Sequence, residues 1–269
     1  MVAFLLLAQE MFIFKSKKKL FFFFKILIIY FLPIYCFSFS LIEKEEINET
    51  NILKKYSHDP SAFTQGFVYQ SDHFFESTGG WGTSEIRKIN KKTGQILKLK
   101  KLNPKYFGEG ITIHNNRIFQ VTWKSKKGFI YDLNNFNLLG EFKIKSQGWG
   151  LTNDGKSLIL SDGTEKIYFL NPNNFEIEKV ISVFKNGEQQ DLINELEFIR
   201  GEIWANIWKN NEIITINPSS GSVTSILDIT NISEQKDIED VPNGIAWDKI
   251  NDRIYITGKN WDFVYLLDI

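Results

Sequence analysis

The sequence predicts an all-β fold, a five-bladed β-propeller. A short pattern, in which a polar or aromatic residue is followed mostly by glycine and then by an apolar residue, occurs five times. It begins at Gln65, Glu109, Trp149, Asn194 and Asn243. Successive starts are 44, 40, 45 and 49 residues apart, with short strand patterns and turn signals between them. Repeats of this length and content are typical of propeller blades.

Two further positions recur in the same register and support five blades. Fourteen residues after the first four starts, and sixteen after the last, stand Gly79, Trp123, Gly163, Trp208 and Lys259. An Asn or Asp also follows an apolar strand in each repeat, at Asn90, Asp132, Asn171, Asn217 and Asp268. The first four of these lead into segments rich in Asn, Pro and Gly, which are turn residues.

Residues 1–40 precede the array and have the layout of a secretory signal peptide. Lysines at 15 and 17–19 come before residues 20–37, an apolar run interrupted by Lys25, and Ser38 and Ser40 follow it. We therefore expect an exported protein, periplasmic or secreted, with no membrane contact after cleavage. The alternative is an uncleaved N-terminal anchor, because a run of about 18 residues is just long enough to span a bilayer.

The rest of the chain is expected to form one domain. Residues 41–50 are polar and charged and are interpreted as a linker, and residues 51–269 as a single five-bladed propeller. The last repeat contains only three strand patterns, so we expect residues 51–57 to complete it as its outer strand and close the ring. Residues 188–193 and 233–240 are the only stretches long enough for a helix, and we interpret both as insertions between blades.

Composition excludes several classes of function. The chain has 32 basic and 32 acidic residues, which gives no electrostatic signature for nucleic acid. Its one cysteine, Cys36, lies in the N-terminal segment, so the mature chain is expected to have no disulfide and no thiol chemistry. Its three histidines, His58, His73 and His114, occupy no repeat position and match no zinc spacing. We expect neither a catalytic metal nor a cofactor.

The repeated positions predict a pocket on the propeller axis, where loops and strand ends from every blade converge. We expect it to be lined by Gln65, Glu109, Trp149, Asn194, Asn243, Trp123, Trp208 and Lys259. Phe63 and Phe107, two residues before Gln65 and Glu109, would extend the aromatic wall. A single tryptophan in a β protein is usually a core residue, but three in one register favour a site. Asn243 could instead mark a turn, and Glu195 could brace Asn194.

Several ordered motifs resemble those of a known family. They are HDPSAFTQG at 58–66, FESTG at 75–79, FGEGIT at 107–112, QVTW at 120–123, GWGLT at 148–152, NELE at 194–197, IWANIW at 203–208 and TGK at 257–259. Together they resemble the plant and bacterial glutaminyl-peptide cyclotransferases, also called glutamine cyclotransferases, over about residues 57–261. The segment after Lys259 departs from many relatives by one residue, which concerns the rim of the pocket.

This resemblance implies a five-bladed propeller enzyme that converts N-terminal glutamine of peptides and proteins to pyroglutamate and releases ammonia without a catalytic metal. It implies that Glu109, Lys259 and Asn194 are catalytic. It further implies that substrate is bound by Gln65, Phe63, Phe107, Trp123, Trp149 and Trp208. A glutamate can accept the proton of the substrate amine and deliver it to the leaving nitrogen. We expect the enzyme to be a monomer.

Two other functions are compatible with a propeller. The first is a non-catalytic secreted protein that binds peptide N-termini or a small ligand. It would need the scaffold motifs but not the carboxylate, the lysine and the aromatic residues together. The second is a metal-dependent hydrolase or lactonase, which would need a cluster of carboxylates and amides around a cation.

Overall fold

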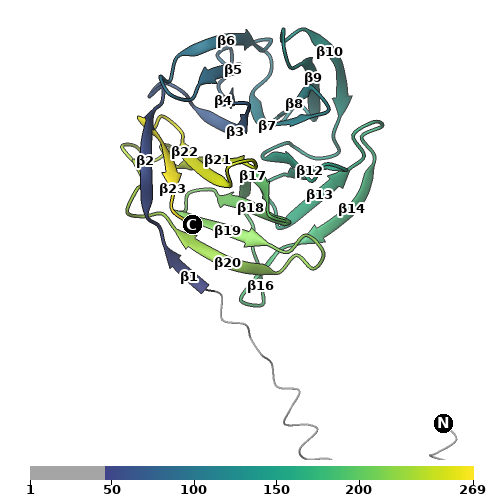
Figure 1. Ribbon diagram of the computed structural model, residues 1–269. Helices are drawn as coiled ribbons and strands as arrows, with labels where there is room; N and C mark the ends of the chain where they lie inside the picture. Colours follow the sequence, from purple (N-terminus) through teal and green to yellow (C-terminus); the bar gives the residue numbers. More distant parts are fainter. Residues whose placement is uncertain (1–45) are drawn as a thin grey trace, which may run out of the picture. The chain divides into compact units, whose positions relative to one another are not determined.

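A computed structural model describes residues 46–269 as a ring of five β-sheets around a central axis (Figure 1). The expected signal peptide lies outside the described residues, as does the first half of the expected linker. Blade 1 consists of β3 Thr64–Gln70, β4 His73–Thr78, β5 Glu85–Asn90 and β6 Ile96–Lys101. Blade 2 consists of β7 Gly108–His114, β8 Arg117–Thr122, β9 Lys127–Asp132 and β10 Leu138–Lys143. Blade 3 consists of β11 Leu151–Asn153, β12 Leu158–Ser161, β13 Lys166–Leu170 and β14 Ile177–Ser182.

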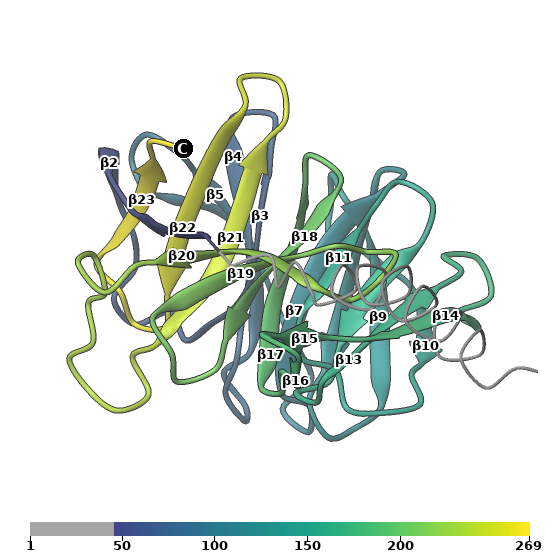
Figure 2. The same cartoon turned by 90° about the horizontal axis from the view of Figure 1, so that it is seen from below.

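The fourth and fifth blades incorporate strands from the beginning of the described chain. Blade 4 consists of β17 Ile193–Ile199, β18 Glu202–Ile207, β19 Glu212–Ile216 and β20 Val223–Asp228, with β1 Glu46–Glu49 added parallel to β20. Blade 5 consists of β21 Pro242–Asp248, β22 Arg253–Gly258, β23 Phe263–Leu267 and β2 Ile52–Ser57. Every other pairing within the blades is antiparallel, and the strands β3, β7, β11, β17 and β21 contact one another around the axis (Figure 1). Figure 2 shows the blades from the side of the ring. The predicted five-bladed propeller is confirmed.

The recurrent Asn and Asp residues close the turn between the third and fourth strands of a blade. In blade 1 the side-chain oxygen of Asn90 accepts hydrogen bonds from the backbone N–H groups of Lys92 and Thr93. Asp132, Asn171 and Asn217 act in the same way in the next three blades. Such bonds from Asn and Asp to their own turn explain why these residue types recur.

The ring closes as predicted, because β2 pairs antiparallel with β23 as the outer strand of blade 5. Asp268, the fifth of the recurrent Asn and Asp residues, therefore follows the third strand of its blade but does not lead through a turn into a fourth strand. Its backbone N–H bonds to Asn51 O at 3.0 Å instead. Residues 46–49 lie within the expected linker but form β1, whose backbone pairs with the open edge of β20.

Residues 183–192 and 229–241 are insertions between blades, but neither is helical. The first contains a hairpin of β15 Phe184–Lys185 and β16 Glu188–Gln189. Asn186 and Gly187 connect its strands and have φ values of 52° and 83°, as in the two-residue turns that Asn-Gly favours. Among the described residues we find no helix with the length and apolarity needed to cross a bilayer.

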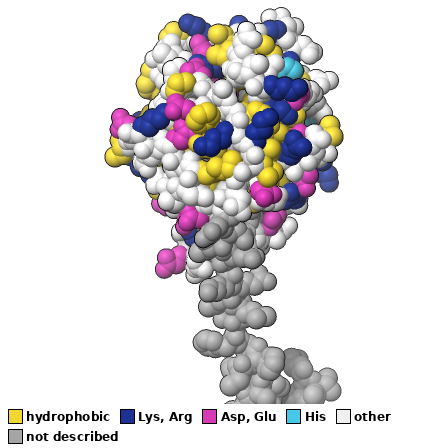
Figure 3. Space-filling model, turned by 60° about the vertical axis from the view of Figure 1, so that its left-hand side comes forward, with side chains coloured by type: hydrophobic (Ala, Val, Ile, Leu, Met, Phe, Trp, Pro, Cys, Tyr) yellow, Lys and Arg dark blue, Asp and Glu magenta, His cyan; other side chains and the backbone are white. Residues whose placement is uncertain are grey.

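Apolar side chains fill the spaces between neighbouring blades. One cluster joins β18 and β19 of blade 4 to β12 and β13 of blade 3, and another joins blades 5 and 1 through Tyr56, Phe67, Phe74 and Tyr255. The surface is mixed, and Figure 3 shows basic, acidic and apolar side chains interspersed on one face. The core is therefore a ring of interfaces, and the strands nearest the axis are held from both sides.

Candidate active site

Bulges in the strands nearest the axis direct the predicted side chains into one place. The register of these strands shifts at Gln65 in β3, at Glu109 and Gly110 in β7, at Asn194 and Glu195 in β17, and at Asn243 and Gly244 in β21. A bulge bends a strand and turns a side chain out of the normal alternation, and bulges are frequent beside active sites. The repeated pattern in the sequence thus corresponds to a repeated backbone irregularity.

Gln65, Glu109 and Asn194 line a cavity of about 300 Å³, at the lower end of the range for ligand pockets. The cavity is lined by Phe63, Gln65, Phe107, Glu109, Trp123, Trp149, Asn194, Trp208, Glu239 and Lys259. All nine residues proposed from the sequence as catalytic or substrate-binding are therefore brought together. Their individual roles remain predictions.

Glu109 and Lys259 are both buried, and they are carried by blades 2 and 5, which are not neighbours in the ring. Glu109 is 5% exposed and Lys259 is 4% exposed. Burial raises the pKa of Glu109 well above its ordinary value, and attraction by Lys259 offsets part of this shift. Burial lowers the pKa of Lys259, against the attraction of Glu109 and Glu239. The sequence left open whether burial or Lys259 has the larger effect on the pKa of Glu109. In the structure burial has the larger effect, and the pKa is raised.

Of the three amide residues expected to line the pocket, Gln65 and Asn194 do so, whereas the expectation for Asn243 is wrong, because its side chain bonds to Gln65 and Thr64 instead. Asn243 is fully buried and donates from Nδ2 to Gln65 Oε1 at 2.8 Å and to Thr64 O at 2.9 Å. It lies within a strand rather than a turn, and it orients Gln65 so that the Nε2 donors of that residue are available to a ligand. Asn194 is 3% exposed, and within residues 46–269 its side chain has no hydrogen-bond partner.

The aromatic walls pack against glycines of the second repeated position. Trp149 contacts Trp208 at a ring-centroid distance of 5.6 Å, and a Cβ at Gly163 would collide with the Trp149 ring. A Cβ at Gly79 would collide in the same way with Phe107, whose ring lies 5.5 Å from Trp123 and 6.3 Å from Phe63. Glycine occupies this position in blades 1 and 3 because the rings of Phe107 and Trp149 need the space there.

Glu195 has a structural position and does not line the pocket. It occupies the place that glycine has in the other four repeats, and its carboxylate reaches the inner strands of blades 1 and 5. One oxygen accepts from the Phe67 N–H at 3.2 Å and the other from the Ile245 N–H at 2.9 Å. The expectation that Glu195 braces Asn194 is wrong. The Glu195 carboxylate instead bonds to backbone N–H groups of blades 1 and 5, and so connects three blades.

Glu239 is the one pocket residue that sequence reasoning missed. It lies in the insertion between blades 4 and 5, and its carboxylate is 3.4 Å from Lys209 Nζ at the rim. No repeat register reaches this insertion, so the sequence carried no signal for it. Near it, the unusual residues after Lys259 are part of the fold, since Trp261 is fully buried and donates from Nε1 to Asp240 O at 3.1 Å.

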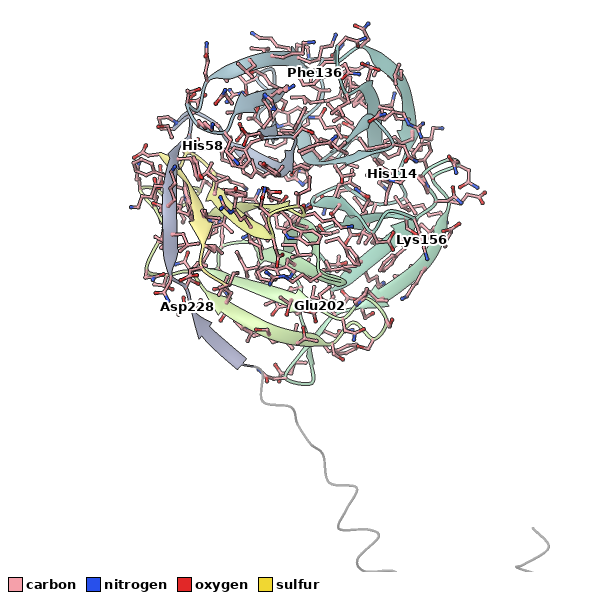
Figure 4. All side chains as sticks on the ribbon, viewed as in Figure 1. His58, His114, Phe136, Lys156, Glu202 and Asp228 are labelled. Atoms are coloured by element: carbon pink, nitrogen blue, oxygen red, sulfur yellow. The ribbon has the colours of Figure 1, made fainter. Side chains whose placement is uncertain are left out.

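The histidines have no place in the pocket. His58 bonds through Nδ1 to Trp261 O at 2.8 Å and through Nε2 to Glu76 Oε1 at 2.9 Å, at the junction of blades 5 and 1. Figure 4 shows His58 and His114 outside the centre of the ring. In the part of the chain that the structure describes, no group of three or more His, Cys, Asp or Glu side chains is arranged to hold a metal ion.

Comparison with known proteins agrees with this geometry. A model of the glutamine cyclotransferase family matches residues 33–269. The chain is 40% identical over 238 residues to a glutaminyl-peptide cyclotransferase of Arabidopsis thaliana, covering 86% of this chain and 74% of the plant protein. The crystal structure of Myxococcus xanthus glutaminyl cyclase superposes with a TM-score of 0.79 and 30% identity, covering 84% of this chain and 98% of that one. The chain therefore belongs to the glutamine cyclotransferase family.

Proposed function

We propose that this enzyme cyclises N-terminal glutamine of peptides and proteins to pyroglutamate and releases ammonia, with no metal in the catalytic step. Membership of the family supports glutaminyl cyclase activity. The structure adds a pocket whose polar groups suit this reaction, and that pocket is lined by one chain, so we propose that a monomer is active.

The observation that carries the proposal is a set of buried polar groups without partners inside an aromatic box. Within the described residues, the side chains of Glu109 and Asn194 have no hydrogen-bond or salt-bridge partner, and Lys259 Nζ lies 4.7 Å over the Phe63 ring. Buried polar groups normally pair within the protein. Groups left unpaired in a cavity at a cost in stability are expected where a ligand supplies the partners.

An N-terminal glutamine supplies those partners. Its α-amine is a donor that matches Glu109, and its γ-carboxamide oxygen is an acceptor that matches donors on Lys259, Asn194 or Gln65. The aromatic walls fold the side chain so that the amine lies close to the carboxamide carbon. Holding an attached nucleophile in this geometry removes much of the entropic barrier to ring closure.

The raised pKa of Glu109 suits it to move the proton. The substrate amine has an ordinary pKa near 8, so at neutral pH it arrives mainly protonated and cannot attack. Because burial raises the pKa of Glu109, transfer of the ammonium proton to this carboxylate costs less than transfer to an ordinary glutamate. The free amine then attacks the carboxamide carbon, and an oxyanion forms that Lys259, Asn194 or Gln65 can stabilise.

The same carboxyl group completes the reaction. Its proton is delivered to the carboxamide nitrogen, the carbon–nitrogen bond breaks, and ammonia leaves. The second amine proton passes to Glu109 and then to the released ammonia, which departs as ammonium and restores the carboxylate, so the carboxyl acts as base and acid within one turnover. In this scheme every proton transfer is made by Glu109, so the step does not call for a metal ion.

The test is mass spectrometry of a short Gln-initiated peptide incubated with the full-length protein, with and without EDTA, and with Glu109→Gln as the control. We expect loss of one ammonia mass from the peptide, insensitive to EDTA and abolished by the substitution. Gln preserves the shape of the side chain but cannot take up a proton. An unchanged peptide in the presence of folded wild-type protein would overturn the proposal in favour of a propeller that only binds.

A further inference from the structure

Trp81 is an exposed aromatic side chain at the edge of the pocket. It is 53% exposed, although a tryptophan is normally largely buried. Its ring contacts Phe107 with a centroid distance of 5.7 Å and an interplanar angle of 70°. Phe107 lines the pocket, but Trp81 does not. Trp81 therefore continues the aromatic wall outwards from the site.

The loop that carries Trp81 corresponds to the loops that carry the second repeated position. Trp123 and Trp208 follow the second strands of blades 2 and 4, and Trp81 follows the second strand of blade 1, two residues beyond Gly79. These loops lie at the same end of their blades. Because Gly79 leaves space that the Phe107 ring fills, the first large side chain of this loop lies farther from the axis.

The loop is held in place although its tryptophan faces solvent. Ser84 Oγ donates to Gly80 O at 2.7 Å and accepts from the Gly108 N–H at 2.9 Å. Gly80 and Gly82, on either side of Trp81, have φ values of 115° and 81°, which side chains other than glycine rarely adopt. The backbone at Trp81 is thus fixed to the residue that precedes Glu109.

We propose that Trp81 forms a subsite for the residue that follows the N-terminal glutamine of the substrate, with preference for an aromatic or large apolar side chain. This inference rests on the proposed function. With the glutamine inside the aromatic box, the peptide must leave through the mouth. The next Cα lies about 3.8 Å farther along the chain, so its side chain is the first that can reach Trp81. In an extended peptide the third side chain points the other way.

The test compares two peptides that differ only at this position, Gln-Phe-Ala and Gln-Gly-Ala, with the full-length wild-type protein and Trp81→Ala. We expect the wild type to favour the phenylalanine peptide, with the difference in KM. Trp81→Ala should raise KM for that peptide about 3- to 10-fold, the scale of one aromatic contact. It should leave kcat unchanged and leave both constants for the glycine peptide unchanged, because the cyclising residue is the same.

Two further variants separate the subsite from a general effect. Trp81→Phe should retain most of the preference. Leu138→Ala, at a residue that is 50% exposed on the outer strand of blade 2, should have no effect. Equal losses for both peptides in Trp81→Ala, or no preference in the wild type, would overturn the subsite while leaving the proposed function intact. No turnover of either peptide by the wild type would overturn both.

Discussion

At the scale of single residues, the pocket contains an acidic and a basic side chain that the fold buries. Glu109 and Lys259 share one aromatic cavity and interact electrostatically, with burial as the larger influence on each. Perturbed pKa values of this kind are common at catalytic sites. Lys259 therefore has an influence on the pH dependence of the reaction that is separate from any contact with the substrate.

Replacement of Lys259 should move the pH dependence of the reaction in a defined direction. Activity requires one proton shared between Glu109 and the substrate amine, so kcat/KM should fall at low pH as both become protonated. Burial raises the pKa of Glu109 above 4.5, so this acid limb should lie above pH 4.5. Lys259→Met removes a charge that lowers the pKa of Glu109, and the acid limb should shift to higher pH.

The measurement is a profile of kcat/KM against pH for the wild type and Lys259→Met. Lys209→Met provides a matched control, because Lys209 is a rim lysine that pairs with Glu239, whereas the charge that lowers the pKa of Glu109 is that of Lys259. It should leave the acid limb in place. A shift of the limb to lower pH in Lys259→Met would contradict the proposed role of the carboxylate.

The residues of the site were predictable from sequence to the extent that they share the repeat register. Gln65, Glu109 and Asn194 occupy one repeated offset, and Trp123 and Lys259 another, so their convergence followed from the blade count. Glu239 and Trp81 lie outside both offsets. Contacts made by an insertion or by a loop tip depend on the path of the backbone, which no periodic pattern in this chain specifies.

At the scale of strands, the inner bulges combine two functions. They aim polar side chains at the axis, and their glycines allow neighbouring strands to approach closely. The Gly110 N–H bonds to Trp149 O at 2.7 Å, and a Cβ on Gly110 would collide with the backbone of blade 3. Blade 4 is the exception, since Glu195 replaces the glycine and extends across the axis.

Removal of the Glu195 carboxylate should destabilise the ring. Glu195→Ala would leave the N–H groups of Phe67 and Ile245 buried and unpaired, at a cost of about 2–6 kcal/mol for the two together. Glu195→Gln retains one acceptor oxygen and should lose about half as much. Chemical denaturation of the three proteins measures the difference. An alanine variant as stable as the wild type would show that these hydrogen bonds make no net contribution to the free energy of unfolding.

The sequence predicted the strand order well and the insertions less well. Turn residues and alternating apolar positions mark the blades, so the ring and its closure by residues 51–57 could be inferred. The stretch 188–193 has no decisive pattern of its own. It is the preceding Asn186-Gly187 turn that pairs residues 188–189 with β15. Residues 46–49 gave no strand signal, because their pairing is through the backbone to an edge already present in blade 4.

At the scale of the whole molecule, the ring is held closed where blade 5 meets blade 1. Besides the pairing of β2 with β23, His58 connects Trp261 O to the Glu76 carboxylate in blade 1. Burial disfavours the imidazolium, but the Glu76 carboxylate, the Trp261 carbonyl and Asp59 together outweigh it and raise the pKa of His58 above 6.5. The closure is therefore partly electrostatic and depends on pH.

Loss of this charged contact should weaken the fold in a pH-dependent way. Since the folded state raises the pKa of His58, its stabilisation is complete below pH 6.5 and decreases as pH rises through the folded-state value. His58→Gln should cost about 3 kcal/mol at the acidic end, the scale of a broken buried pair. Its difference from the wild type should shrink as pH rises. A constant difference in unfolding free energy at all pH values would show that the imidazole acts only by packing.

Closure by β2 also means that the two ends of the propeller meet within one sheet, with Asp268 N bonded to Asn51 O. A ring of this kind has no structurally required starting point. A circular permutant that joins residue 268 to residue 51 through a turn such as Asn-Pro-Ser-Ser-Gly, and opens at residues 172–173 in blade 3, should fold and retain turnover. Its activity on a Gln-initiated peptide would show that the break in the chain and the chemistry on the axis are independent of each other.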